Sequence, residues 1–152
     1  MAAVPNTSIV TRGAVVSINH WLYVSKSTIS IEKSVTEIEN IVRDAHVKNA
    51  MLGVTGALVF GGGHFCQVIE GPPAALLMLR SDIMTDHRHT AIKTLADGKI
   101  DRRRFEGWSL AYSGASMVVS RAIQRSLRDF AQGSDNAGIE LLQLIDELVT
   151  PL

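Results

Sequence analysis

Residues 53–71, with the sequence GVTGALVFGGGHFCQVIEG, determine the fold that we expect for this chain. Apolar residues fill most of 53–60 and 65–70, and three consecutive glycines at 61–63 separate the two runs. Short apolar runs on either side of a glycine-rich turn are typical of a β-hairpin. Gln67 is the exception, because its amide lies in the middle of an apolar strand. A buried amide without partners costs about 1–3 kcal/mol, so Gln67 needs a hydrogen-bond partner from the chain or from a bound polar molecule.

The remainder of the chain extends this hairpin into a βαββαβ order. Outside the hairpin we expect, in chain order, strand 18–25, helix 34–47, helix 74–84, strand 91–96, strand 108–112, and helices 118–131 and 137–149. Ser34 and Glu37 have the spacing of a capping box at the start of the first helix. The order predicts an α+β fold, a ferredoxin-like sandwich with an added fifth strand and two C-terminal helices. Right-handed crossovers would place both helices of the βαββαβ unit on one face of the sheet, with Tyr23 and Gln67 side by side beneath them.

Composition limits the classes of function. The 152 residues suffice for one domain with a substantial core, and 15 basic residues balance 15 acidic ones. This balance argues against a protein that coats nucleic acid or an anionic membrane. The single cysteine, Cys66, fits a reducing compartment, and the apolar runs are too short to span a membrane. We expect a cytoplasmic protein with an N-terminal extension (1–17), a main domain (18–113) and a C-terminal helical cap (114–152).

A small set of polar residues has no obvious role at the surface. They are Tyr23, Asn49, Gln67 and Trp108. A phenol, two amides and an indole suit hydrogen bonding to a flat ligand rich in heteroatoms. None of them titrates near neutrality, so the set is poorly suited to acid–base hydrolysis. Each residue taken alone is also compatible with an ordinary core position. His87 and His89 lack partners at metal-ligand spacing, so we expect no metal site.

Five segments of the chain together match one known family. They are LYVS at 22–25, Asn49 with GVTG at 53–56, FCQVIEG at 65–71, DHRH at 86–89 and RFEGWS at 104–109. In these segments, in this order, the chain resembles the BLUF domains, which are flavin-binding sensors of blue light. The resemblance implies that residues 18–113 bind a flavin non-covalently between the two helices of the sandwich. It implies FAD as the cofactor, with FMN as an alternative.

The resemblance also implies roles for individual residues. Tyr23 would give an electron and a proton to the excited flavin, and Gln67 would bridge the two and relay the proton. Trp108 matches a tryptophan whose position inside or outside the site is associated with signalling. The implied cofactor-binding residues are Ser25, Lys48, Asn49, Phe65, Gln67, Arg88 and His89. Among these, Asn49 would hold the polar edge of the ring, and Arg88 would contact the ribityl or phosphate part.

One position departs from the family pattern. The family commonly has methionine two residues after the tryptophan, and this chain has Leu110. Leucine keeps the apolar volume but lacks the adaptable thioether. We therefore expect flavin binding to persist, with an effect on dark recovery or on coupling to the output.

The implied protein is a sensor without enzymatic turnover. It would signal to a separate effector protein, as a homodimer or higher oligomer, and the C-terminal helices would cover the open face of the sheet or form a dimer contact. A hydrolase similar to acylphosphatases is one alternative, but it needs an arginine near the first strand, where 23–26 reads YVSK. The other is a protein-interaction module that no longer responds to light. The intact Tyr23, Asn49 and Gln67 argue against that module, whereas Leu110 leaves it open.

Overall fold

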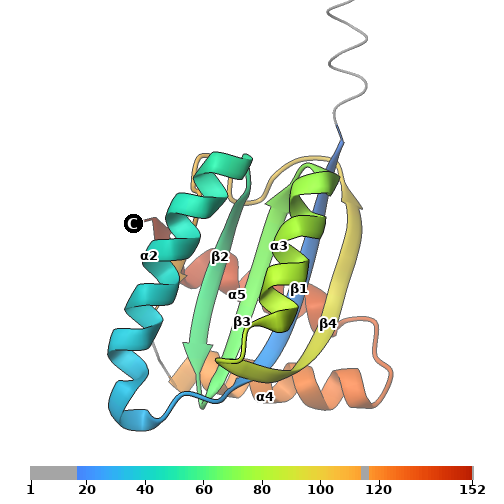
Figure 1. The fold of residues 1–152 in the computed structure, drawn as a ribbon. Coiled ribbons are helices and arrows are strands. Elements are labelled where there is room, and N and C mark those ends of the chain that lie inside the picture. Colours follow the sequence, from blue (N-terminus) through green and yellow to red (C-terminus); the bar gives the residue numbers. More distant parts are fainter. Residues whose placement is uncertain (1–16, 114–116, 152) are drawn as a thin grey trace, which may run out of the picture.

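The computed structural model describes residues 17–113 and 117–151, which form a mixed six-stranded sheet with helices on both faces (Figure 1). The elements are β1 (Ile18–Ser27), the 3₁₀ turn η1 (Ile31–Lys33), α2 (Ser34–Leu52), β2 (Thr55–Gly61), β3 (His64–Gly71), α3 (Pro73–Thr85), β4 (His89–Ile100), β5 (Ala111–Ser113), α4 (Met117–Ala131), α5 (Ala137–Leu148) and β6 (Thr150–Pro151). The strand order is β4-β1-β3-β2-β5-β6, and β5 runs parallel to β2. The predicted ferredoxin-like arrangement is confirmed. Except for Ser17, the predicted N-terminal extension lies outside the described residues.

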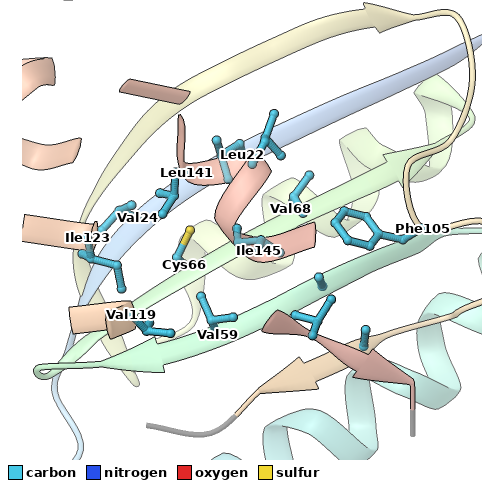
Figure 2. Close-up of a cluster of buried hydrophobic side chains, with 14 residues drawn as sticks. Leu22, Val24, Val59, Cys66, Val68, Phe105, Val119, Ile123, Leu141 and Ile145 are labelled. Carbon is cyan, nitrogen blue, oxygen red and sulfur yellow. The ribbon is translucent and has the colours of Figure 1, made fainter. Parts of the chain in front are cut away.

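Two layers of helices enclose the sheet. Helices α2 and α3 cover one face, and α4 and α5 cover the other, as Figure 1 shows. The core beneath α4 and α5 is apolar, and Figure 2 shows Cys66 there, between the strands and the C-terminal helices. Burial of each leucine or isoleucine in this layer contributes about 1.5–3 kcal/mol. The C-terminal helices therefore close the face that the two crossovers leave open.

The central strands β1 and β3 set the position of the polar pair. They run antiparallel, and Tyr23 lies directly opposite Gln67 in their register. Because side chains alternate along a strand, the neighbouring pair Val24 and Cys66 faces the α4 and α5 layer. Tyr23 and Gln67 therefore lie side by side beneath α2 and α3, as predicted.

The start of α2 differs from the prediction. The 3₁₀ turn η1 leads directly into the helix, so Ser34 already has helical backbone angles (φ −60°, ψ −43°). Its hydroxyl donates to the carbonyl oxygen of Ile31 at 2.8 Å, and the N-cap residue is Lys33. A capping serine requires an extended backbone, so the expected capping box does not form.

Several helices and strands also begin or end at residues other than the predicted ones. Helix α2 continues past the predicted end at residue 47, so Lys48 and Asn49 lie within the helix. Gly53, expected to begin a strand, adopts φ +69° and ends the helix in the left-handed region that favours glycine. Strand β4 is longer than the predicted 91–96, β5 begins three residues later than predicted, and the short β6 has no counterpart in the prediction.

Candidate functional site

A cavity of about 250 Å³ lies between α2, α3 and the sheet. Its apolar lining consists of Ile41, Ala45, Leu58, Phe65, Leu79 and Ile83. Its polar lining consists of Tyr23, Asp44, Lys48, Asn49, Gln67, Asp82, Asp86, Arg88 and His89. All the site residues predicted from the sequence therefore line this cavity, except Ser25 and Trp108.

A short hydrogen bond joins the two central residues of the site. The phenol of Tyr23 donates to Gln67 Oε1 at 2.5 Å, and both side chains are buried. Burial raises the pKa of the Tyr23 phenol well above its usual range, so the phenol keeps its proton. Within the described part of the chain, Gln67 Nε2 donates no hydrogen bond. That amide nitrogen is therefore available to a ligand in the cavity.

Asn49 lies in the last turn of α2, where its side chain is held by a hydrogen bond. Its side chain is only 2% exposed, and Nδ2 donates to the backbone oxygen of Ser109 at 3.0 Å. The Ser109 hydroxyl in turn contacts Nδ1 of His46 at 2.8 Å. These contacts fix the Asn49 amide between the helix and the segment before β5, and they leave Oδ1 as an acceptor for a ligand N–H.

Ser25 supports the site through His89 and does not line the cavity itself. His89 Nε2 lies 2.7 Å from the carbonyl oxygen of Ile83, which only accepts, so Nε2 carries the hydrogen. In the neutral ring, Nδ1 then accepts from the Ser25 hydroxyl at 2.7 Å. The imidazole is thereby fixed in one orientation beside Tyr23, with 5.9 Å between the ring centroids.

Charged pairs surround the mouth of the cavity. Arg88 Nε and Nη2 donate to the carboxylate of Asp86, at 2.6 Å for the Nη2–Oδ2 contact. These hydrogen bonds lower the pKa of Asp86 and raise that of Arg88. Lys48 on α2 forms an ion pair with Asp82 on α3. The sequence reasoning did not single out Asp44 or Asp82, although the four-residue spacing between Asp44 and the predicted site residue Lys48 places those two side chains on one face of α2.

Trp108 lies away from the predicted photochemical pair. It packs with Phe105 against the core beneath α4 and α5, with 6.5 Å between the ring centroids. The structure therefore does not bring Trp108 together with Tyr23 and Gln67. Leu110 is fully buried under α2, in the cluster that contains the cavity residues Leu58 and Phe65.

Glu70, which the sequence reasoning did not single out, anchors the segment that leads to Trp108. Its buried carboxylate accepts from the backbone N–H groups of Arg104 and Phe105 at 2.8 and 2.7 Å, and from the Thr55 hydroxyl at 2.8 Å. We expect Glu70→Ala to lower the free energy of unfolding by about 2–4 kcal/mol, because it leaves buried donors unpaired.

Urea denaturation of the wild type and of Glu70→Ala measures the difference in their free energies of unfolding. Glu70→Gln is the matched variant, because it keeps the side-chain volume and one acceptor oxygen, and we expect it to lose less stability than Glu70→Ala. Equal stability of Glu70→Ala and the wild type would contradict the anchoring role.

The geometry of the cavity suits a planar ligand. Apolar side chains from α2, α3 and the sheet form its walls, while Gln67 Nε2 and Asn49 Oδ1 offer one donor and one acceptor. A mostly apolar cavity with a few placed polar groups is typical of cofactor sites. The ring of a flavin, which carries both donors and acceptors along one edge, fits this set of residues.

The sequence profile of one family matches residues 18–111: BLUF, sensors of blue light using FAD. The chain belongs to this family. Residues 18–111 include both central strands and all the cavity-lining residues. The chain is therefore a flavin-binding blue-light sensor, and the hydrogen bond between Tyr23 and Gln67 fits the tyrosine–glutamine pair that the resemblance implied.

Individual relatives agree with this assignment. The chain is 38% identical over 80 residues to the blue light- and temperature-regulated antirepressor BluF of Escherichia coli, covering 53% of this chain and 20% of the relative. The dark-state structure of the BLUF protein BlrB superposes with a TM-score of 0.71 at 30% identity, covering 87% of this chain and 97% of BlrB. The structure of Klebsiella pneumoniae BlrP1 with FMN and cyclic diGMP gives a TM-score of 0.56 at 31% identity, and the match covers 65% of this chain and 25% of BlrP1. The chain spans 9–20% of the length of the curated relatives that it matches.

Within 17–113 and 117–151, no group of three or more His, Cys, Asp or Glu side chains is arranged to hold a metal ion. In the same residues, no helix combines the length and the apolar character that crossing a membrane requires.

Proposed function

We propose that Tyr23 and Gln67 form a light-driven switch, in which electron and proton transfer from Tyr23 through Gln67 rearranges the hydrogen bonds around a non-covalently bound flavin. When excited by blue light, the flavin supplies a strong one-electron oxidant. The observation that carries the proposal is the 2.5 Å hydrogen bond from the Tyr23 phenol to Gln67 Oε1 at the cavity. Tyr23 loses an electron, its phenol proton becomes acidic, and Gln67 Oε1 is the acceptor already in place.

Gln67 is suited to store the change because its amide is asymmetric. The side chain offers an acceptor oxygen on one side and a donor nitrogen on the other, so rotation or tautomerisation exchanges what it presents to the flavin and to Tyr23. A buried polar network with two satisfied arrangements has two discrete states. When the electron and the proton have both returned to Tyr23, the altered hydrogen bonds of Gln67 persist around a chemically unchanged flavin. The expected signature is a small red shift that decays in the dark.

The proposed cofactor is FAD, with FMN as an alternative. Asn49 Oδ1 and Gln67 Nε2 would bind the polar edge of the ring, and Phe65 would contribute to its apolar walls. The volume of about 250 Å³ falls below the range of about 300–1,000 Å³ typical of pockets for drug-sized ligands, which suits the ring rather than the whole cofactor. The ribityl and phosphate parts would lie at the mouth, near Lys48 and Arg88. Lys48 and Arg88 already pair with carboxylates. We therefore expect the site to discriminate only weakly between FAD and FMN, which differ in the number of phosphates.

Output is proposed to pass to a separate effector protein, with the chain acting as a homodimer or higher oligomer and without enzymatic turnover of its own. The antirepressor function that the name of the Escherichia coli relative states supports an output through protein contacts. A cytoplasmic location is part of the proposal, supported by a single, fully buried cysteine that is free.

An absorption spectrum of the purified protein, in the dark and immediately after blue illumination, tests the switch. A flavin spectrum that shifts slightly to the red and returns in darkness is the expected result. Absence of a chromophore even after addition of FAD would refute the proposal. Bound flavin without a reversible shift would show that Tyr23 and Gln67 do not form a working switch.

We predict that Asn49→Ala weakens flavin binding by about tenfold or more, because a hydrogen bond in a buried site contributes about 1–2 kcal/mol. Titration of flavin-free protein with FAD, followed by quenching of flavin fluorescence, measures the dissociation constant. Asn40→Ala is the matched control on the same helix, because the Asn40 side chain is bonded to Arg43 and does not line the cavity. Equal dissociation constants for the two variants would remove Asn49 from the proposed site.

A further inference from the structure

Tyr23 has an aromatic neighbour, Trp21, that does not line the cavity. Trp21, two residues earlier on β1, is 1% exposed, and its ring stacks on the Tyr23 ring with 4.5 Å between the centroids and 30° between the planes. Tyr23 lines the cavity, whereas Trp21 does not. Of the two rings, only Tyr23 reaches the cavity, and Trp21 contacts Tyr23 directly.

A cation covers the Trp21 ring. The guanidinium carbon of Arg80, on α3, lies 4.5 Å from the centroid of the Trp21 ring. Arg80 is kept there by Nη1, which donates to Asp97 at 3.3 Å, and by Nη2, which donates to the Thr94 hydroxyl at 3.4 Å. The same hydroxyl accepts from Trp21 Nε1 at 2.9 Å. The indole is thus fixed between Tyr23, Thr94 and Arg80.

This arrangement opposes oxidation of the indole. A cation over an aromatic face is attracted to the neutral ring, but it repels the same ring once an electron has left. The carboxylate of Asp97 offsets part of this repulsion, since it pairs with Arg80. The hydroxyl of Thr94 is no base, so it does not remove the N–H proton to relieve the positive charge.

We propose that Trp21 is a second electron donor in series behind Tyr23, and that Arg80 keeps the oxidation on Tyr23. The inference rests on the proposed role of Tyr23. After Tyr23 has lost its electron and passed its proton to Gln67 Oε1, an electron from Trp21 would fill the vacancy on Tyr23. Tyr23 would recover its proton from Gln67, and Trp21 would be left one electron short. Return of the first electron to Trp21 then closes the cycle with Gln67 in its starting arrangement.

Electron transfer from Trp21 is therefore an unproductive branch, which Arg80 suppresses. In this account Trp21 is the residue next in line behind Tyr23, in place of Trp108, which packs against the opposite face of the sheet. Arg80 acts through Trp21 and is a positioning residue for the light reaction.

Three variants loaded with FAD test the branch by transient absorption. Arg80→Met keeps the apolar stem and removes the charge, and we expect it to lower the yield of the red-shifted state at least threefold and to form a tryptophan radical. Arg80→Lys keeps the charge and should keep the yield. Adding Trp21→Phe to Arg80→Met should restore the yield. An unchanged yield in Arg80→Met, or a loss that persists in the double variant, would overturn the proposal.

A second measurement, without flavin, separates this proposal from the proposed function. The chain has two tryptophans, so Trp108→Phe leaves Trp21 as the single one. Ultraviolet photoionisation of Trp21 in this flavin-free protein creates a radical that Tyr23 can reduce, with its phenol proton moving to Gln67. We expect Arg80→Met to increase the fraction that remains as tryptophan radical severalfold, and Tyr23→Phe to block the transfer. Equal fractions with and without Arg80 would overturn the proposal even where the wild type photoswitches, and a difference would support it even where the wild type does not.

Discussion

Gln67→Leu is expected to bind flavin and to give no red-shifted state after blue light. Leucine approximates the volume of glutamine, so the apolar walls of the cavity still accept the ring. It removes both the Oε1 acceptor of the Tyr23 phenol and the Nε2 donor that faces the ligand. The buried phenol is left without its partner, which lowers the free energy of unfolding by about 1–3 kcal/mol. A light-minus-dark difference spectrum of the flavin-loaded variant measures the result.

The matched control is Gln143→Leu, the same substitution at an exposed position on α5. It should bind flavin and photoswitch like the wild type. The amount of flavin bound per protein separates a failed switch from a failed fold. A persistent red shift of wild-type size in Gln67→Leu would show that the amide is not the switching group.

The sequence predicts the fold well where an apolar pattern and a turn signal indicate the same element. The hairpin 53–71 combines apolar strands with a glycine turn, and the observed β2 and β3 pair through that turn. The βαββαβ order then fixes which strands are central, and hence that Tyr23 lies opposite Gln67. The capping box fails because its pattern is local. The preceding 3₁₀ turn already makes the backbone helical at Ser34, and no pattern within the helix reports that turn.

The site is predicted less completely, because several of its contacts join residues that are distant in the sequence. Lys48 and Asp82 are 34 residues apart, and they meet because α2 and α3 lie on the same face. Trp108 belongs to a family motif, but the face on which it packs depends on the path of the loop that Glu70 anchors. The contact between Trp21 and Arg80 depends in the same way on the position of α3 over β1.

Tyr23→Phe is expected to bind flavin with little loss of affinity and to form no red-shifted state. Phenylalanine keeps the ring and its stacking on Trp21, but it removes the O–H that donates to Gln67 Oε1. Phenylalanine is harder to oxidise than tyrosine and carries no acidic proton. The variant side chain can therefore supply neither the electron to the excited flavin nor the proton to Gln67. Because burial raises the pKa of Tyr23, the wild-type phenol stays protonated throughout the neutral range, and its photoswitching should not change with pH there.

Tyr112→Phe provides the control for Tyr23→Phe, since Tyr112 is the other tyrosine of the chain and lies on β5. We expect this control to photoswitch normally. The proposed series of donors adds a second readout. With the Tyr23 phenol gone, excitation of the flavin should give at most a short-lived tryptophan radical from Trp21, and no rearrangement of Gln67, because no proton has been delivered to it. A normal red-shifted state in Tyr23→Phe would mean that an electron without a proton suffices to turn Gln67, and the switch would then have to be assigned to the amide alone.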